Sequence, residues 1–97
     1  MTLTFNDETT VDIINLNEQM VNRDKNVWSL MCTITSPMTQ ETVDTILTEE
    51  NISSMTVSSG ETDKIISGYN AVVVVSIRYD ENLNTTTDVQ LRKFEGV

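Results

Sequence analysis

Histidine is absent from this chain of 97 residues, and cysteine occurs once, at Cys32. The absence of histidine removes the commonest general base and metal ligand of proteins. A single cysteine excludes an intramolecular disulfide bond and a multi-cysteine zinc site. The sequence also has no glycine-rich phosphate-binding loop and no EF-hand calcium loop. We therefore expect a protein that is not an enzyme and that uses no cofactor and no metal ion.

Basic residues are scarce: 6 Lys and Arg stand against 15 Asp and Glu, which gives a net charge of −9. Such a charge repels nucleic acid phosphates and anionic membrane surfaces, so we expect neither as a partner. The acids are spread along the chain, which is typical of a solubilising surface. The alternative is a decoy that occupies the nucleic-acid-binding groove of another protein. A decoy needs its carboxylates on one surface, and the candidates are Glu41, Asp44, Glu49, Glu50, Glu61 and Asp63.

Long apolar runs are missing as well. The longest continuous run, Ala71–Val75, is far too short to span a bilayer. Residues 1–5 lack a basic stretch and a long apolar run, so we expect no signal peptide. A lone cysteine fits a reducing compartment, or a particle assembled in one, and we expect Cys32 to be a buried structural thiol.

The stretch Ala71–Tyr79 contains four consecutive valines. The branched Cβ of valine disfavours a helix and suits a pleated strand. Apolar side chains would point to both faces, so we predict a central strand that is covered on both sides at its start. Replacing Val74 with Asp would then bury a carboxylate and unfold the domain. One face would present Ala71, Val73, Val75, Ile77 and Tyr79, and the other Val72 and Val74.

Turn-forming residues divide the rest of the chain into further strands. The first two expected strands should form a hairpin. The segment that follows them, residues 15–20, is ambiguous, because Leu16 and Met20 have helical spacing but the two asparagines disfavour a helix interior. The last strand should pair antiparallel with Ala71–Tyr79, because the loop between them is short. Residues 95–97 are expected to be a frayed end. The further strands are predicted at residues 2–5, 9–14, 27–35, 52–58, 63–67 and 85–94.

One short helix is expected over about Gln40–Glu49, with Thr39 as its N-cap. Such a helix is too short to be stable alone, so its apolar stripe must pack on the sheet. The predicted fold class is α+β, mostly β: an antiparallel sheet, or sheets, of about six to seven strands with one short helix packed on one face. Residues 1–97 are expected to form a single domain. The helical stripe consists of Val43, Ile46 and Leu47.

The strand expected at residues 52–58 is a candidate interaction edge. Its alternation breaks at Ser53 and Ser54, which is typical of a bulge or an edge position. An exposed edge can add to the sheet of a neighbouring protein. The apolar residues predicted to take part are Ile52, Met55 and Val57.

Glu49, Glu50 and Trp28 complete the candidate interaction residues. The two glutamates are expected at the C-terminal end of the helix, where they slightly oppose the helix dipole and are best explained as a solvated end. The only tryptophan, Trp28, is expected to be a core anchor at the start of a strand. An exposed tryptophan that binds a partner is the alternative.

Five short motifs are distributed over most of the chain: Leu3–Asp7, Trp28-Ser29-Leu30, Glu50-Asn51-Ile52-Ser53, Gly68-Tyr69 and Leu91-Arg92-Lys93. In type and order they resemble those of small proteins from siphophage tail modules and from prophages of Gram-positive bacteria. The resemblance implies a virion-associated tail or baseplate component that acts by assembly and not by catalysis. It transfers no functional residues.

Two hypotheses about function follow. The first is a phage structural or tail-accessory protein that binds other copies of itself or neighbouring tail proteins. Its basis is the expected β-rich single domain, the missing catalytic groups and the resemblance to tail proteins. The second is a small acidic phage-encoded inhibitor of a host defence nuclease or sensor, which presents carboxylates where phosphates normally bind. The expected location is the virion or the host cytoplasm.

Overall fold

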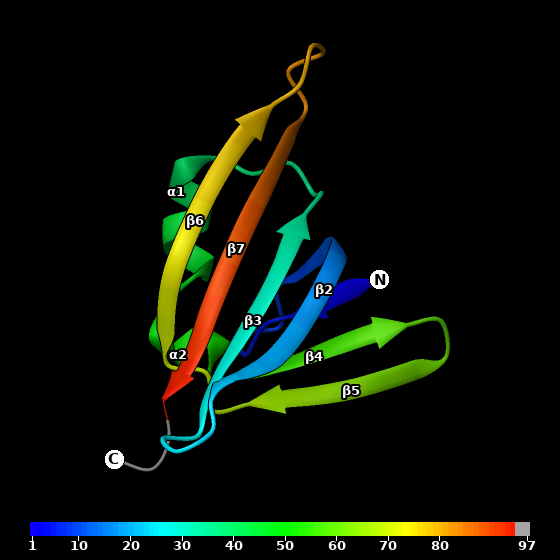
Figure 1. Cartoon of the computed structure of the whole chain (residues 1–97). Coiled ribbons are helices and arrows are strands. Elements are labelled where there is room, and N and C mark those ends of the chain that lie inside the picture. The colour runs from blue at the N-terminus through cyan, green and yellow to red at the C-terminus, as the bar shows by residue number, and fades with distance from the viewer. Residues whose placement is uncertain (95–97) are drawn as a thin grey trace.

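The computed structural model describes residues 1–94, which form seven strands and two short helices (Figure 1). The strands make one antiparallel sheet in the order β5-β4-β1-β2-β3-β7-β6, which confirms the expected α+β, mostly β class. Residues 95–97, expected to be a frayed end, lie outside the described residues. The elements are β1 (Thr2–Thr4), β2 (Thr10–Asn22), β3 (Val27–Ile34), α1 (Gln40–Ile46), α2 (Glu49–Ile52), β4 (Ser54–Ser59), β5 (Thr62–Ser67), β6 (Ala71–Tyr79) and β7 (Thr85–Phe94).

Strand β2 is longer than expected and bends within its length. Its first residues pair with β1, where Leu3 lies opposite Val11, and the remainder pairs with β3. The bend falls at Asn15, which has a φ of 56°, and the register with β3 shifts between Ile14 and Asn17. Asparagine tolerates this left-handed conformation better than most residues. The N-terminal hairpin is thus confirmed, and the ambiguous segment after it is a strand.

Two helices replace the single helix expected from the sequence. Thr39 caps α1 as predicted, because its hydroxyl accepts a hydrogen bond from the backbone N–H of Thr42. The helix ends at Ile46, and Thr48 begins α2 with the same kind of cap, toward the N–H of Asn51. A threonine inside the expected helix therefore starts a new turn of helix instead of continuing the first. The buried amide of Asn51 donates to the carbonyl oxygen of Ile46 at 2.8 Å and so joins the two helices.

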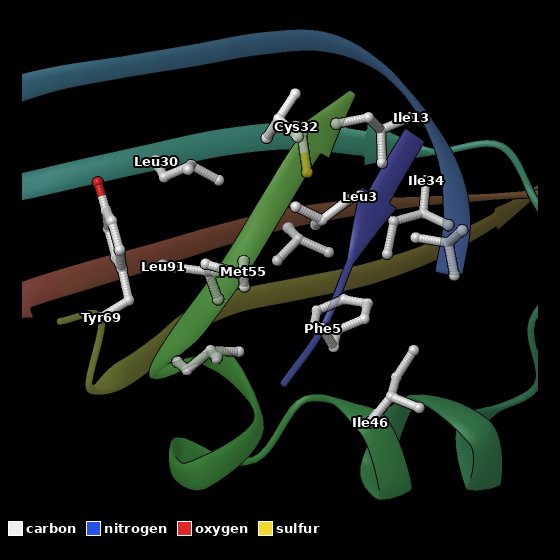
Figure 2. Close-up of a cluster of buried hydrophobic side chains, with 14 of the residues drawn as sticks. Leu3, Phe5, Ile13, Leu30, Cys32, Ile34, Ile46, Met55, Tyr69 and Leu91 are labelled. Atoms are coloured by element: carbon white, nitrogen blue, oxygen red, sulfur yellow. The ribbon is translucent and has the colours of Figure 1, made fainter. Parts of the chain in front are cut away.

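The core lies where the β1–β4 part of the sheet crosses the β3–β7 part, with the helices on one side (Figure 2). Leu3 of β1, Leu30 of β3, Met55 of β4 and Leu91 of β7 point toward one another there, and all are fully buried. Ile46 closes this cluster from α1. The predicted packing of the helical stripe is confirmed, since its other members also belong to the core or contact it.

Strand β6 lies at an edge of the sheet and not at its centre, so the prediction for this strand is wrong. It pairs antiparallel with β7, as expected, and with no other strand of the described chain. A register shift between Val72 and Val74 places Val73 in a bulge. Side chains after the bulge therefore point to the opposite face from the one that unbroken alternation would give them. Val73 and Val74 are 49% and 45% exposed, whereas Val72, Val75 and Ile77 pack against the core. Valine suits either environment of a strand, so composition does not distinguish an edge from a centre.

Candidate functional site

The interaction edge expected from the sequence is buried. Ile52 ends α2, Met55 and Val57 belong to β4, and none of the three exceeds 6% exposure. Strand β4 is also paired on both sides, with β5 and with β1. The break in alternation at Ser53 marks the end of α2, where the serine hydroxyl donates to the carbonyl oxygen of Glu50 at 2.6 Å. The prediction is therefore wrong for these three residues, which belong to the core.

Glu49 and Glu50 are exposed, as predicted, but they begin α2 and do not end a longer helix. Carboxylates at this end of a helix interact favourably with its dipole. Both glutamates line a hollow of about 440 Å³ together with residues 68–70, which lead into β6. The backbone N–H of Gly68 donates to the carbonyl oxygen of Ser53 at 2.9 Å and holds this segment against the end of α2. The two carboxylates therefore lie near the start of β6.

Trp28 is half-buried and packs against the margin of the core, as expected of an anchor. Its indole N–H donates to Oδ1 of Asn26 at 3.1 Å. The Nζ atom of Lys93 lies 5.6 Å from the centre of the Trp28 ring and 5.4 Å from that of Tyr69. Cation–π attraction is favourable at these distances. Trp28 thus helps to position Lys93 beside Tyr69.

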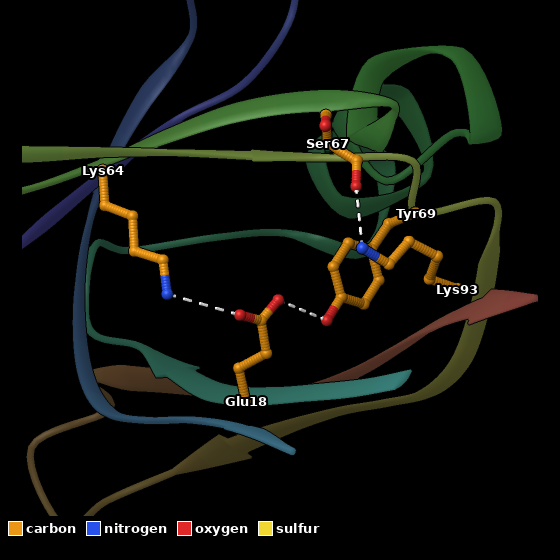
Figure 3. A network of polar contacts seen from close by, with 5 residues as sticks. All are labelled: Glu18, Lys64, Ser67, Tyr69 and Lys93. Carbon is orange, nitrogen blue, oxygen red and sulfur yellow. Dashed lines mark hydrogen bonds and ion pairs between the residues drawn. The ribbon is translucent and has the colours of Figure 1, made fainter. Parts of the chain in front are cut away.

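Tyr69 is held immediately ahead of β6 by the polar network of Figure 3. Its side chain is buried, and its hydroxyl donates to Oε2 of Glu18 at 2.6 Å. Lys64 Nζ lies 3.5 Å from the other oxygen of Glu18, and Lys93 Nζ donates to the carbonyl oxygen of Ser67 at 3.3 Å. Burial, together with the Glu18 carboxylate, raises the pKa of Tyr69, so its hydroxyl stays protonated and remains a donor. These contacts join β2, β5 and β7 to the segment that fixes where β6 begins.

The outer side of β6, here called the open edge, is the candidate site. No strand within residues 1–94 pairs with it. Its regular part beyond the bulge is Val74–Tyr79. Arg78 is the only charged residue of the strand, and its Nε lies 2.8 Å from Oδ2 of Asp88 in β7. Unpaired backbone N–H and C=O groups at such an edge can form hydrogen bonds with a strand of another chain.

The turn between β6 and β7 presents an exposed leucine in an uncommon backbone conformation. Leu83 has a φ of 63° and is 78% exposed. Asp80 organises the turn, because its Oδ1 accepts from the N–H of Asn84 at 2.9 Å and of Asn82 at 2.8 Å. The hydrogen bonds from Asn84 and Asn82 lower the pKa of Asp80. The left-handed conformation favours Gly and Asn over Leu, so the stability of the fold does not explain a leucine here.

Cys32 offers no nucleophile. It is 5% exposed, which confirms the expected buried thiol, and burial with the nearby Asp88 raises its pKa to about 11. The thiolate required for attack is therefore scarce at neutral pH. Within residues 1–94, no group of three or more Cys, Asp and Glu side chains is arranged to hold a metal ion.

The six carboxylates of the decoy hypothesis divide between two places. Figure 1 shows the helices and the β4–β5 turn on opposite sides of the molecule. The β1–β2 turn lies beside the helices, since the backbone N–H of Asp7 donates to Oδ1 of Asn51 at 2.8 Å. Glu41, Asp44, Glu49 and Glu50 belong to the helical side, whereas Glu61 and Asp63 belong to the β4–β5 turn and the start of β5.

Comparison with known proteins identifies no relative: no family model, no curated protein and no solved structure matches this chain. The two helices of the described chain are too short to cross a membrane. The open edge of β6 and the turn at its end are two features of this surface that the packing of the fold does not account for.

Proposed function

We propose that this chain is a structural or tail-accessory protein of a phage or prophage virion, which acts by protein–protein assembly and not by catalysis. The observation that carries the proposal is the open edge of β6, which combines unpaired backbone groups with the exposed side chains of Val73 and Val74. The motifs that resemble siphophage tail proteins support a virion as the assembly. The partners are neighbouring tail proteins or further copies of the chain.

Mass spectrometry of purified virions, together with light scattering of the isolated chain, tests this proposal. We expect the chain in intact particles. Val74→Lys, which places a charge beside the open edge, should be depleted from particles. Ile65→Lys is the matched control, because Ile65 is 74% exposed on β5, the other edge strand. A chain that is strictly monomeric in solution and absent from particles would refute the proposal.

The second candidate function is inhibition of a host defence nuclease or sensor in the host cytoplasm. The observation in its favour is the helical side of the molecule, where Asp7 joins the carboxylates of α1 and α2 and where the sequence has no Lys or Arg between residues 26 and 63. The separation of Glu61 and Asp63 from that side weakens it. If it holds, Glu49→Gln with Glu50→Gln should abolish inhibition of the nuclease, and Val74→Lys should leave inhibition unchanged.

A further inference from the structure

The two edge strands of the sheet differ in their protection against other chains. Natural edge strands commonly present charged side chains that prevent further pairing. Strand β5 has Asp63 and Lys64 in succession, and Lys64 reaches across to Glu18. Strand β6 has only Arg78, which is already paired with Asp88. Strand β6 therefore has fewer charged side chains than β5 and is the less protected of the two edges.

Acidic side chains stand at both ends of the open edge. Glu49 and Glu50 line the hollow next to the start of β6, and Asp80 and Glu81 are exposed in the turn that follows it. A second copy of the chain would bring acid against acid in either direction of pairing. Antiparallel pairing places the turn of one copy beside α2 of the other, and parallel pairing places each acidic end beside its equivalent. Like charges brought together in this way repel, so the charge pattern disfavours a second copy as the added strand.

We propose that the open edge of β6 binds an extended segment of a partner protein that has alternating apolar residues in its middle and Lys or Arg at both ends. This inference rests on the proposed assembly function and names the chemistry of its partner. Backbone hydrogen bonds to Val74–Tyr79 supply affinity, and the basic ends meet the carboxylates at each end of the edge.

The exposed side chains at the end of β6 extend the same surface. Tyr79 and Leu83 are 67% and 78% exposed, and both lie next to Asp80 and Glu81. A strained residue that the fold does not require is an indicator of function. Leu83 contacts the apolar stems of the basic side chains at one end of the bound segment, because long basic side chains pack their methylenes on apolar surface.

The test uses the full chain and labelled synthetic peptides, with fluorescence anisotropy as the readout. The probe peptide alternates valine and threonine and has two lysines at each end. One comparison peptide has glutamates in place of the lysines, and another has a proline in its middle, which removes a backbone donor. We expect the glutamate peptide to bind at least about tenfold more weakly than the lysine peptide, and the proline peptide not to bind. Binding of the lysine peptide should weaken as salt is added.

Variants of the chain locate the site. Val74→Lys should weaken binding of the lysine peptide by about tenfold or more, and Ile65→Lys on β5 should leave it unchanged. Glu49→Gln with Glu50→Gln should reduce the preference for lysine over glutamate ends without abolishing binding. Leu83→Asn should weaken binding while raising the melting temperature, a combination that a merely structural role of Leu83 does not produce.

The outcomes separate this inference from the proposed function. Equal affinity for the lysine and glutamate peptides, or equal losses in Val74→Lys and Ile65→Lys, would overturn the partner chemistry. Self-association of the chain that Val74→Lys abolishes would also overturn it, since the added strand would then be a second copy. If the chain is nevertheless present in virions and Val74→Lys is depleted from them, the assembly function stands and only the partner chemistry fails.

Discussion

Val74→Asp and Val75→Asp test the bulge in β6, because two neighbours of one strand face opposite environments. Val74 is 45% exposed and lies opposite Gln90, whereas Val75 packs against the core opposite Val89. Full burial of a valine contributes roughly 1.5–3 kcal/mol, so loss of the half-exposed Val74 side chain costs about 1 kcal/mol. A carboxylate that faces the core at position 75 costs several kcal/mol, even where it takes up a proton.

Thermal and urea unfolding followed by circular dichroism measure both costs. A domain of this size has a free energy of unfolding on the order of 5–15 kcal/mol. Val74→Asp should therefore melt cooperatively, about 4–8 °C below the parent, and Val75→Asp should lose at least twice as much or fail to fold. Ile65→Asp, on the exposed side of β5, reports the cost of an aspartate on an edge strand alone. Collapse of Val74→Asp would refute the bulged register and restore the covered strand expected from the sequence.

Three further variants or measurements follow from the structure. Leu83→Asn should stabilise the chain by about 1 kcal/mol, seen as a higher melting temperature, because asparagine tolerates the positive φ. Because the pKa of Asp80 is lowered, its contribution to folding stability is present above the ordinary pKa of 3.8 and is lost as the pH falls through the pKa of the folded state. The melting temperature of Asp80→Asn should therefore depend less on pH in that range than the melting temperature of the parent. Cys32, with a pKa of about 11, should be alkylated at mildly alkaline pH only at the rate of unfolding, and prompt alkylation of the folded chain would contradict its burial.

Local signals were sufficient to predict most strands. The regular alternation from Trp28 to Ile34 is a strand as expected, and each turn rich in Asn, Asp or Gly separates two strands. The cap at Thr39 was predicted because it depends on the residues next to it. The second cap, at Thr48, was missed because helical spacing continues through it.

The position of β6 depends on contacts that its own sequence does not contain. Pairing of β3 with β7 places β6 at the edge, and the two partners are more than fifty residues apart in the chain, as in the pair Cys32 and Val89. A run of valines has the same side chain at every position, so a one-residue bulge at Val73 leaves no trace in the hydrophobic pattern. The prediction of an interaction edge at residues 52–58 failed for a related reason, because the position of a strand in a sheet depends on which other strands pair with it.

The polar network around Tyr69 also cannot be predicted from the sequence. Its members come from β2, β5, the segment before β6, and β7, and the hydrogen bond between Tyr69 and Glu18 joins residues 51 positions apart. In the sequence, Tyr69 is marked only by its place in a Gly-Tyr motif that resembles those of other proteins. A buried tyrosine needs a partner for its hydroxyl, but a pattern of residues does not indicate which carboxylate supplies it.

The acidic composition and the open edge of β6 can be explained together. A long apolar edge strand is ordinarily a site of aggregation, because copies of the same chain pair through it. In this chain the carboxylates of Glu49, Glu50, Asp80 and Glu81 stand at the two ends of that edge. Under the partner chemistry proposed above, they oppose pairing between copies and attract a segment with basic ends. Solubility of the chain and binding of a basic segment are then two effects of the same side chains. Glu49→Gln with Glu50→Gln should accordingly make the chain more prone to self-association and weaken its discrimination between basic and acidic peptides. The control is Glu41→Gln with Asp44→Asn, which removes the same two charges from exposed positions of α1. Light scattering of the two variants therefore distinguishes the position of the charge from its amount.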